Sequence, residues 1–115
     1  MRLKILLVED EPLILMDIEF QLREAGHEVI SVGNGDSAID VLVSRLVDVV
    51  LTDIDMPGSM DGLKLAAVVR NRWPPVQIVV MSGKRRPARD ELPHRARFIE
   101  KPLHTSDLLK AIAIW

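Results

Sequence analysis

Polar side chains with complementary chemistry stand directly after several short apolar runs of this chain. They comprise carboxylates, a hydroxyl and an ammonium group: Glu9, Asp10, Asp53, Ser82 and Lys101. In an open parallel α/β sheet, ligands bind beyond the carboxyl ends of the strands, so groups that are far apart in sequence converge there. Carboxylates bind a hard cation such as Mg²⁺, and hydroxyl and ammonium groups bind the oxygens of an anion. These residues therefore predict a phosphoryl-transfer site that holds a cation and an anion together.

The segments that would position these groups alternate between strand-like runs and amphipathic helical stretches. The expected strands are 3–8, 27–32, 49–53, 76–81 and 98–100. The expected helices are Pro12 to Ala25, a second one capped by Asp36 or Ser37, a third from about Asp61, and a last one from about Thr105 with Leu108, Leu109, Ile112 and Ile114 on its apolar side. This alternation is typical of βα units and a parallel sheet, so the fold class is α/β.

The composition limits the class of protein. A chain of 115 residues corresponds to one domain, which we expect to span residues 1–115 with no effector domain after Trp115. The net charge of −2 gives no reason to expect membrane or nucleic-acid binding. The absence of cysteine fits a reducing cytosol, and no apolar run has the length of a signal peptide or transmembrane span. We therefore expect a cytoplasmic location.

One segment departs from the alternation. Residues 83–97 are rich in arginine and contain few aliphatic side chains, and Pro87 and Pro93 interrupt them. A regular helix with an apolar stripe cannot form there, so we expect at most a turn or two in a mobile basic loop. A solvated loop is the simplest interpretation and docking of an acidic partner is the alternative. The lack of aromatic residues for base stacking argues against nucleic acid.

Four blocks of sequence carry a more specific signal: Leu7–Pro12, Thr52–Gly58, Val80–Gly83 and Phe98–Pro102. They resemble, in the same order and over nearly the whole chain, the signature blocks of response-regulator receiver domains. The resemblance implies a doubly wound parallel sheet of five strands in the order 2-1-3-4-5, a flavodoxin-like three-layer sandwich. It also implies a phosphoacceptor domain of a two-component or phosphorelay system that signals and is not an enzyme. The short basic segment in place of a regular fourth helix is atypical.

The resemblance further assigns roles to individual residues. Asp53 would accept a phosphoryl group from a sensor histidine kinase or a histidine phosphotransfer protein. Mg²⁺ would be bound by Asp53, by Asp10 directly, by Glu9 through water, and by the main-chain carbonyl of Asp55. Asp55 and Lys84 would influence the lifetime of the phosphoryl group. The chemistry is consistent, because an aspartyl phosphate requires a carboxylate nucleophile and a cation.

The remaining roles concern the response to phosphorylation. Lys101 would neutralise the phosphoryl group, and a cis Lys101-Pro102 bond would direct its ammonium inward. Ser82 would donate a hydrogen bond to a phosphoryl oxygen, and Phe98 would follow as the switch aromatic and alter the binding of a downstream protein target. Plain core packing is the alternative for Phe98.

The same residues are compatible with two other functions. Asp53 and Asp55 also resemble the paired aspartates of haloacid-dehalogenase-type phosphatases, although Pro57 stands where that family has threonine or valine. The second alternative is a module that binds partners without phosphorylation. The first helix carries apolar residues outside its sheet-facing side, among them Leu13 and Phe20, which predicts either a docking face for the phosphodonor or core packed from two directions.

Overall fold

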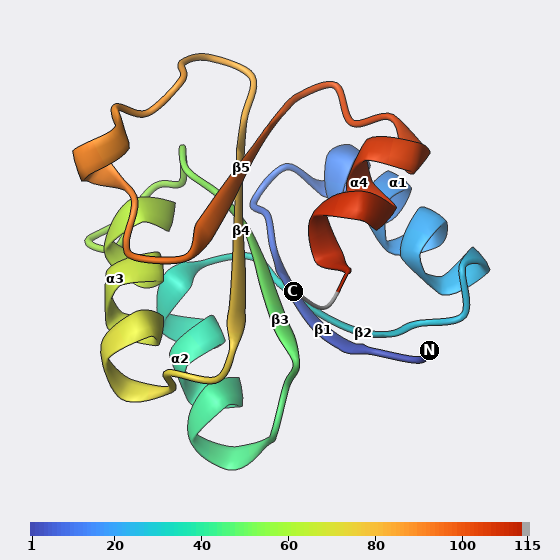
Figure 1. Cartoon of the computed structure of the whole chain (residues 1–115), viewed down its shortest axis with the longest axis horizontal. Coiled ribbons are helices and arrows are strands. Elements are labelled where there is room, and N and C mark those ends of the chain that lie inside the picture. Colours follow the sequence, from blue (N-terminus) through green and yellow to red (C-terminus); the bar gives the residue numbers. More distant parts are fainter. Residues whose placement is uncertain (114–115) are drawn as a thin grey trace.

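The alternating apolar and amphipathic segments form strands and helices that follow one another in strict succession. The computed structural model describes residues 1–113 (Figure 1), so Ile114 of the expected last helix lies outside the described residues. The strands are β1 (Lys4–Val8), β2 (Glu28–Val32), β3 (Val49–Asp53), β4 (Gln77–Ser82) and β5 (Ala96–Glu100). The helices are α1 (Pro12–Glu24), α2 (Gly35–Ser44), α3 (Gly62–Arg72) and α4 (Thr105–Ile112), with a 3₁₀ turn η1 (Arg89–Glu91). Within residues 1–113, none of the helices combines the length and the apolar character that crossing a bilayer requires.

The five strands form one sheet in the order β2-β1-β3-β4-β5. All four strand pairs are parallel. The α/β prediction and the strand order implied by the resemblance are therefore confirmed. In this order β2 is the neighbour of β1 on one side and β3 is its neighbour on the other. The segment that follows β1 therefore runs toward β2, whereas the segment that follows β3 runs in the opposite direction, toward β4. This reversal opens a crevice at the carboxyl ends of β1 and β3, the usual ligand position in doubly wound sheets.

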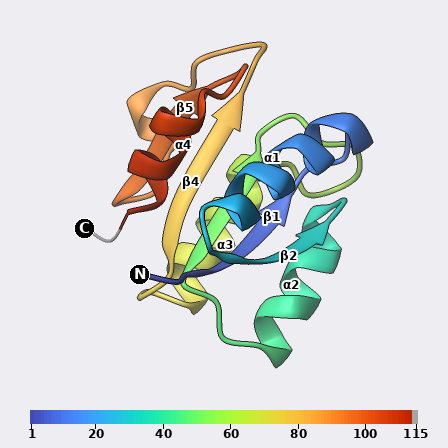
Figure 2. The ribbon, with the colours of Figure 1, turned by 90° about the vertical axis from the view of Figure 1, so that its right-hand side faces the viewer.

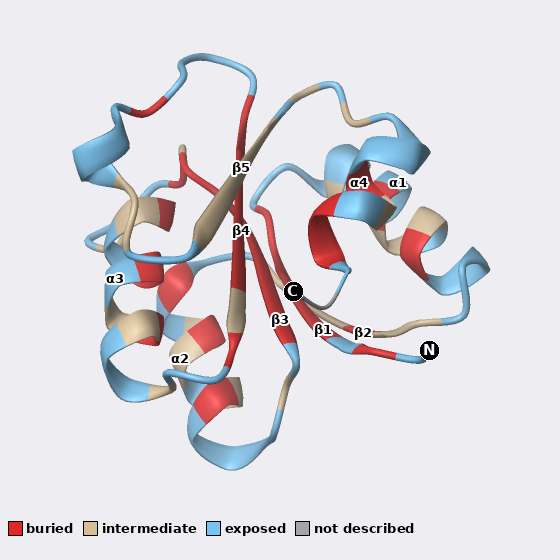
Figure 3. Cartoon of the chain, in the orientation of Figure 1, coloured by how far each residue is buried: buried red, intermediate tan, exposed pale blue. Residues whose placement is uncertain are grey.

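Helices cover both faces of the sheet, which explains why β1 is a continuous apolar run. Figure 2 shows α1 and α4 on one face and α2 and α3 on the other. Ile5 and Leu7 pack in the cluster with α1 and α4, whereas Leu6 and Val8 pack in the cluster with α2 and α3. The central strands are accordingly the most buried part of the molecule (Figure 3). The site at their carboxyl ends is thus built on a rigid support.

Capping side chains decide where the helices begin. Asp61 accepts a hydrogen bond from the Lys64 N–H at 2.9 Å and starts α3 where the sequence predicted it. The prediction for α2 was wrong, because its cap is Asn34 and the helix already begins at Gly35. The Asn34 side chain accepts from the Ser37 N–H at 2.8 Å. Asn34 has an extended backbone, which allows its side chain to reach the first turn, so the cap lies earlier in the chain than predicted.

The connection between β4 and β5 contains only the η1 turn, which confirms the prediction that no regular helix forms there. The guanidinium group of Arg70 on α3 binds the end of this connection that precedes β5. This group donates to the backbone carbonyls of His94 and Pro74 at 2.7 Å each, of Val76 at 3.1 Å and of Arg95 at 3.4 Å. One side chain of α3 therefore holds both the segment before β4 and the segment before β5.

Candidate functional site

The carboxylates predicted to converge do so at the crevice between β1 and β3. Glu9 and Asp10 directly follow β1, and Asp53 is the last residue of the neighbouring strand β3. Ligand oxygens of the three side chains all lie within 4.8 Å of one another. Glu9 and Asp53 are buried, with 1% and 5% of their surface exposed, whereas Asp10 is exposed. Three negative groups at such distances repel one another unless a cation joins them.

Lys101 supplies a positive charge to this cluster. Its Nζ lies 2.5 Å from Glu9 Oε1 and 3.3 Å from Asp53 Oδ1. The residue follows β5, and its backbone N–H donates to the Ser82 carbonyl at 3.0 Å, which ties the end of β5 to the end of β4. The Lys101-Pro102 bond is cis, as the resemblance implied. The ammonium group is therefore shared between two buried carboxylates.

The surroundings of Asp53 alter its acidity. Burial is the largest influence and, with the negative charge of Glu9, it raises the pKa of Asp53 from 3.8 to about 6. The charge of Lys101, its hydrogen bond and the N–H of Asp55 act in the opposite direction but do not outweigh burial. Near neutral pH the side chain is nevertheless mainly ionised. It is thus a buried carboxylate that is a stronger base than an ordinary aspartate.

Ser82 occupies the carboxyl end of β4 but its hydroxyl does not join the carboxylate cluster. It is fully buried, and its O–H donates to Asp55 Oδ2 at 2.9 Å. Its Oγ accepts from the backbone N–H groups of Lys84 at 3.2 Å and Arg85 at 3.3 Å. The structure therefore places Ser82 beside Asp55, on the loop after β3, and at the start of the basic connection.

A cavity of about 800 Å³ opens over the cluster. Its wall includes Glu9, Asp10, Asp53, Asp55, Lys84 and Lys101, together with Leu13 and Ile14 from α1. Predicted site residues from four separate parts of the chain, at the ends of β1, β3, β4 and β5, thus face one space. Phe98 is not among the residues that line this cavity. It is half-buried, packs against the apolar cluster beneath α2 and α3, and has the Arg86 guanidinium carbon 5.3 Å from its ring centroid.

Gly62 supports the site and was missed by the sequence analysis. A Cβ at this position would lie 1.9 Å from the carbonyl oxygen of Asp53. The Gly62 N–H donates to the Ile54 carbonyl at 2.9 Å, so the start of α3 lies directly against the backbone that carries Asp53. The available signal was a glycine immediately after the capping residue Asp61, a helix position at which other residues are normally preferred.

Comparison with known proteins agrees with this geometry. The family model described as response regulator receiver domain matches residues 5–113. The transcriptional regulatory protein PdtaR of Mycobacterium tuberculosis is 32% identical, with 96% of this chain and 55% of that protein covered. The response regulator protein FleR of Pseudomonas aeruginosa is 34% identical, with coverages of 72% and 17%. The chain therefore belongs to the response regulator receiver domain family.

Solved structures give the same result. A response regulator receiver protein from Sinorhizobium medicae has a TM-score of 0.86 and 33% identity, with 96% of this chain and 91% of that chain covered. The response regulator TrrA of Thermotoga maritima, solved in complex with Mg²⁺ and BeF, has a TM-score of 0.86 and 28% identity, with coverages of 96% and 98%. This chain is thus a signalling receiver domain, and the phosphatase alternative is not favoured. It spans 55% of PdtaR and 17% of FleR.

Proposed function

We propose that Asp53 accepts a phosphoryl group from a phosphohistidine of a sensor histidine kinase or a histidine phosphotransfer protein. The observation that carries this proposal is the position of Asp53, which is buried at the end of β3, clustered with Glu9 and Asp10, and 3.3 Å from the Lys101 ammonium. A carboxylate oxygen of Asp53 forms the new bond to phosphorus while the bond from phosphorus to the donor imidazole nitrogen breaks. The leaving imidazole keeps the electron pair of that bond.

The residues of the cluster fit Mg²⁺. Hard oxygen ligands within 4.8 Å of one another are what this cation prefers, and the cavity above them leaves room for its waters. Asp10 and Asp53 would bind it directly, Glu9 through water, and Asp55 through its main-chain carbonyl. When bound, Mg²⁺ supplies positive charge for the oxygens of the transferring phosphoryl group. The complex of TrrA with Mg²⁺ and BeF supports this assignment for a related chain.

Lys101 would contribute a positive charge to the transfer step, and Asp53 would contribute the nucleophile. Lys101 lines the cavity, and its ammonium, 3.3 Å from Asp53 Oδ1, would neutralise negative charge on the transferring phosphoryl group. In the metal-free protein the pKa of Asp53 is about 6, so the nucleophile is mainly ionised at neutral pH, and a bound cation would favour the ionised form further. No group of the chain needs to remove a proton from the nucleophile, so positioning and charge neutralisation account for the step.

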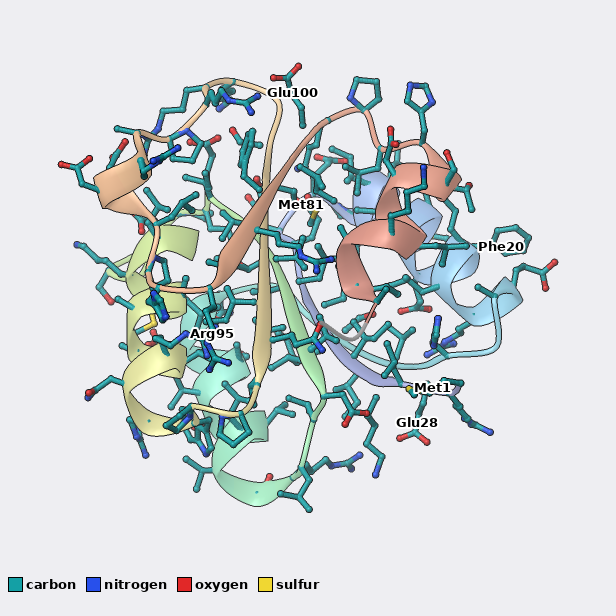
Figure 4. The ribbon with its side chains drawn as sticks, viewed as in Figure 1. Met1, Phe20, Glu28, Met81, Arg95 and Glu100 are labelled. Atoms are coloured by element: carbon teal, nitrogen blue, oxygen red, sulfur yellow. The ribbon has the colours of Figure 1, made fainter. Side chains whose placement is uncertain are left out.

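The surface beside the cavity suits the donor protein. On α1, Leu13, Met16 and Phe20 are 75%, 64% and 63% exposed. Phe20 points away from the sheet (Figure 4). Leu13 and Ile14 also line the cavity, so the apolar strip is continuous with the site. A donor that packs on this strip would bring its phosphohistidine to Asp53.

The response to phosphorylation would pass through residues outside the cluster. Ser82 would donate to a phosphoryl oxygen, and Phe98 would change its packing and alter the binding of a downstream protein target. Asp55 and Lys84 line the cavity, where they would influence how readily water reaches the phosphoryl group. In this function the chain is modified once for each signal and does not turn over a substrate.

Labelling with acetyl phosphate and Mg²⁺ tests the proposal. Intact-mass measurement should show the addition of one phosphoryl group that hydroxylamine removes, as expected of an acyl phosphate. Asp53→Asn should abolish the addition, whereas Asp40→Asn, the same change at an exposed position of α2, should not. Asp10→Ala should abolish both Mg²⁺ binding and labelling while the protein stays folded. Undiminished labelling of Asp53→Asn, or repeated hydrolysis of a small phosphate monoester, would refute the assignment.

A further inference from the structure

The Ser82 hydroxyl already makes all the hydrogen bonds that a hydroxyl can make. It donates one, to Asp55 Oδ2 at 2.9 Å, and its oxygen accepts two, from Lys84 N–H and Arg85 N–H. A serine has a single O–H donor and two acceptor lone pairs. A phosphoryl oxygen is an acceptor only. Ser82 therefore cannot donate to a phosphoryl group without first giving up its bond to Asp55.

We propose that the Asp55 carboxylate is a positioning residue that competes with the phosphoryl group for the Ser82 proton and so holds the unphosphorylated state. This inference rests on the proposed function, because it requires a phosphoryl group on Asp53. Hydrogen bonds to an ionised acceptor are stronger than neutral ones, so the carboxylate is an effective competitor. The side chain at position 55 thus sets the free energy that the phosphoryl group must supply to release the Ser82 hydroxyl.

The backbone around Asp55 is suited to this role because it is fixed against β4. Ile54 N–H donates to the Met81 carbonyl at 2.9 Å, and Asp53 lies in register with Met81 across the strand pair. Ser82 is the next residue and is fully buried. Ser82 is therefore held at the end of β4, and Asp55 directly follows a residue whose backbone is hydrogen-bonded to the same strand.

Release of Ser82 would move more than one side chain. The N–H groups of Lys84 and Arg85 bind the same oxygen, so the start of the basic connection follows Ser82. The next residue, Arg86, lies over the Phe98 ring and is 3.8 Å from the Glu100 carboxylate. The segment from Ser82 to Arg86 therefore joins the Asp55 contact at one end to the Phe98 ring at the other.

A double-mutant cycle tests the competition. Titration calorimetry measures the affinity of each variant for beryllofluoride at saturating Mg²⁺. Asp55→Ala should bind beryllofluoride about tenfold more tightly than the wild type, since one hydrogen bond to a charged group no longer has to be broken. In the Ser82→Ala background the same change should have no effect. Asp55→Asn keeps an acceptor oxygen and removes the charge, so its affinity should lie between those of the wild type and Asp55→Ala.

A spectroscopic measurement separates release of Ser82 from a simple loss of charge. The chain contains two phenylalanines, Phe20 and Phe98, so 4-fluorophenylalanine gives two ¹⁹F signals. Without beryllofluoride, Asp55→Ala should shift the Phe98 signal toward its position in the beryllofluoride complex. The signal of Phe20, which is exposed on α1, should not move.

The outcomes distinguish this inference from the function on which it rests. If the wild type does not bind beryllofluoride with Mg²⁺, the proposed function fails and the competition fails with it. If the wild type binds but Asp55→Ala has the same effect in both backgrounds, Asp55 acts through its charge alone and only this inference is overturned. An Asp55→Asn variant that matches Asp55→Ala would overturn it in the same way.

Discussion

Replacement of Asp53 by asparagine should stabilise the metal-free protein at neutral pH but not at low pH. Burial and the charge of Glu9 raise the pKa of Asp53 to about 6, against 3.8 in the unfolded chain. A carboxyl group with a higher pKa in the folded state binds its proton more tightly when folded. The stability that this proton provides is fully present below the unfolded pKa and is lost as the pH rises through about 6. Ionised Asp53 therefore destabilises the fold at neutral pH, and Asp53→Asn removes that cost.

The size of the effect follows from the two pKa values. A difference of about two units corresponds to about 3 kcal/mol of unfolding free energy. The side chain borders an open cavity, where solvent and neighbouring polar groups screen its charge, so we expect about 1–2 kcal/mol. In a domain of this length, a change of 1 kcal/mol shifts the melting temperature by about 4 °C. The variant should therefore melt about 4–8 °C above the wild type at neutral pH.

Thermal and urea unfolding in EDTA, followed by circular dichroism, measures this difference across the pH range. The gain should be largest above about pH 7, shrink below about pH 6 and vanish near pH 4. Asp40→Asn serves as the control, because Asp40 is exposed on α2 and its replacement should change little. A gain that does not depend on pH, or a variant that is less stable at neutral pH, would show that burial of the Asp53 charge is not the cause.

Three further changes test how the framework holds the site. Gly62→Ala should lower the free energy of unfolding in urea by about 3 kcal/mol, because its Cβ would meet the Asp53 carbonyl oxygen at 1.9 Å. The control Gly33→Ala, at a position with open space around it, should leave the free energy of unfolding nearly unchanged. Arg70→Ala should cost about 1–3 kcal/mol and speed amide hydrogen exchange between β4 and β5, since the carbonyls of His94, Val76 and Arg95 lose the donor that Arg70 supplies. Unchanged exchange would contradict this. Burial lowers the pKa of His27 below 6.5, so the fold should lose stability as the pH drops through 6.5. In the same pH range, the urea midpoint of His27→Gln should depend less on pH than that of the wild type.

The sequence by itself determined the fold class, the strand order through a family resemblance, and the edge at which the site lies. The fold class and the position of the site depend on local patterns, whereas the strand order followed from the resemblance. A strand buried on both faces must be apolar throughout, as β1 is, and the chain can reverse only where turn and capping residues permit it. Prolines and missing aliphatic side chains are equally local, which is why the absence of a regular helix between β4 and β5 was predictable.

Only the tertiary structure decided how the site residues use their hydrogen bonds and charges. The pKa of Asp53, the donation of Ser82 to Asp55 and the contact of Gly62 with the Asp53 carbonyl each join residues that the fold brings together. The sequence shows which groups a chain carries, but a pKa depends on burial and on the distance to other charges. A hydroxyl likewise donates to whichever acceptor lies within reach. Because these distances arise when separate strands and loops meet, they are properties of the folded chain alone.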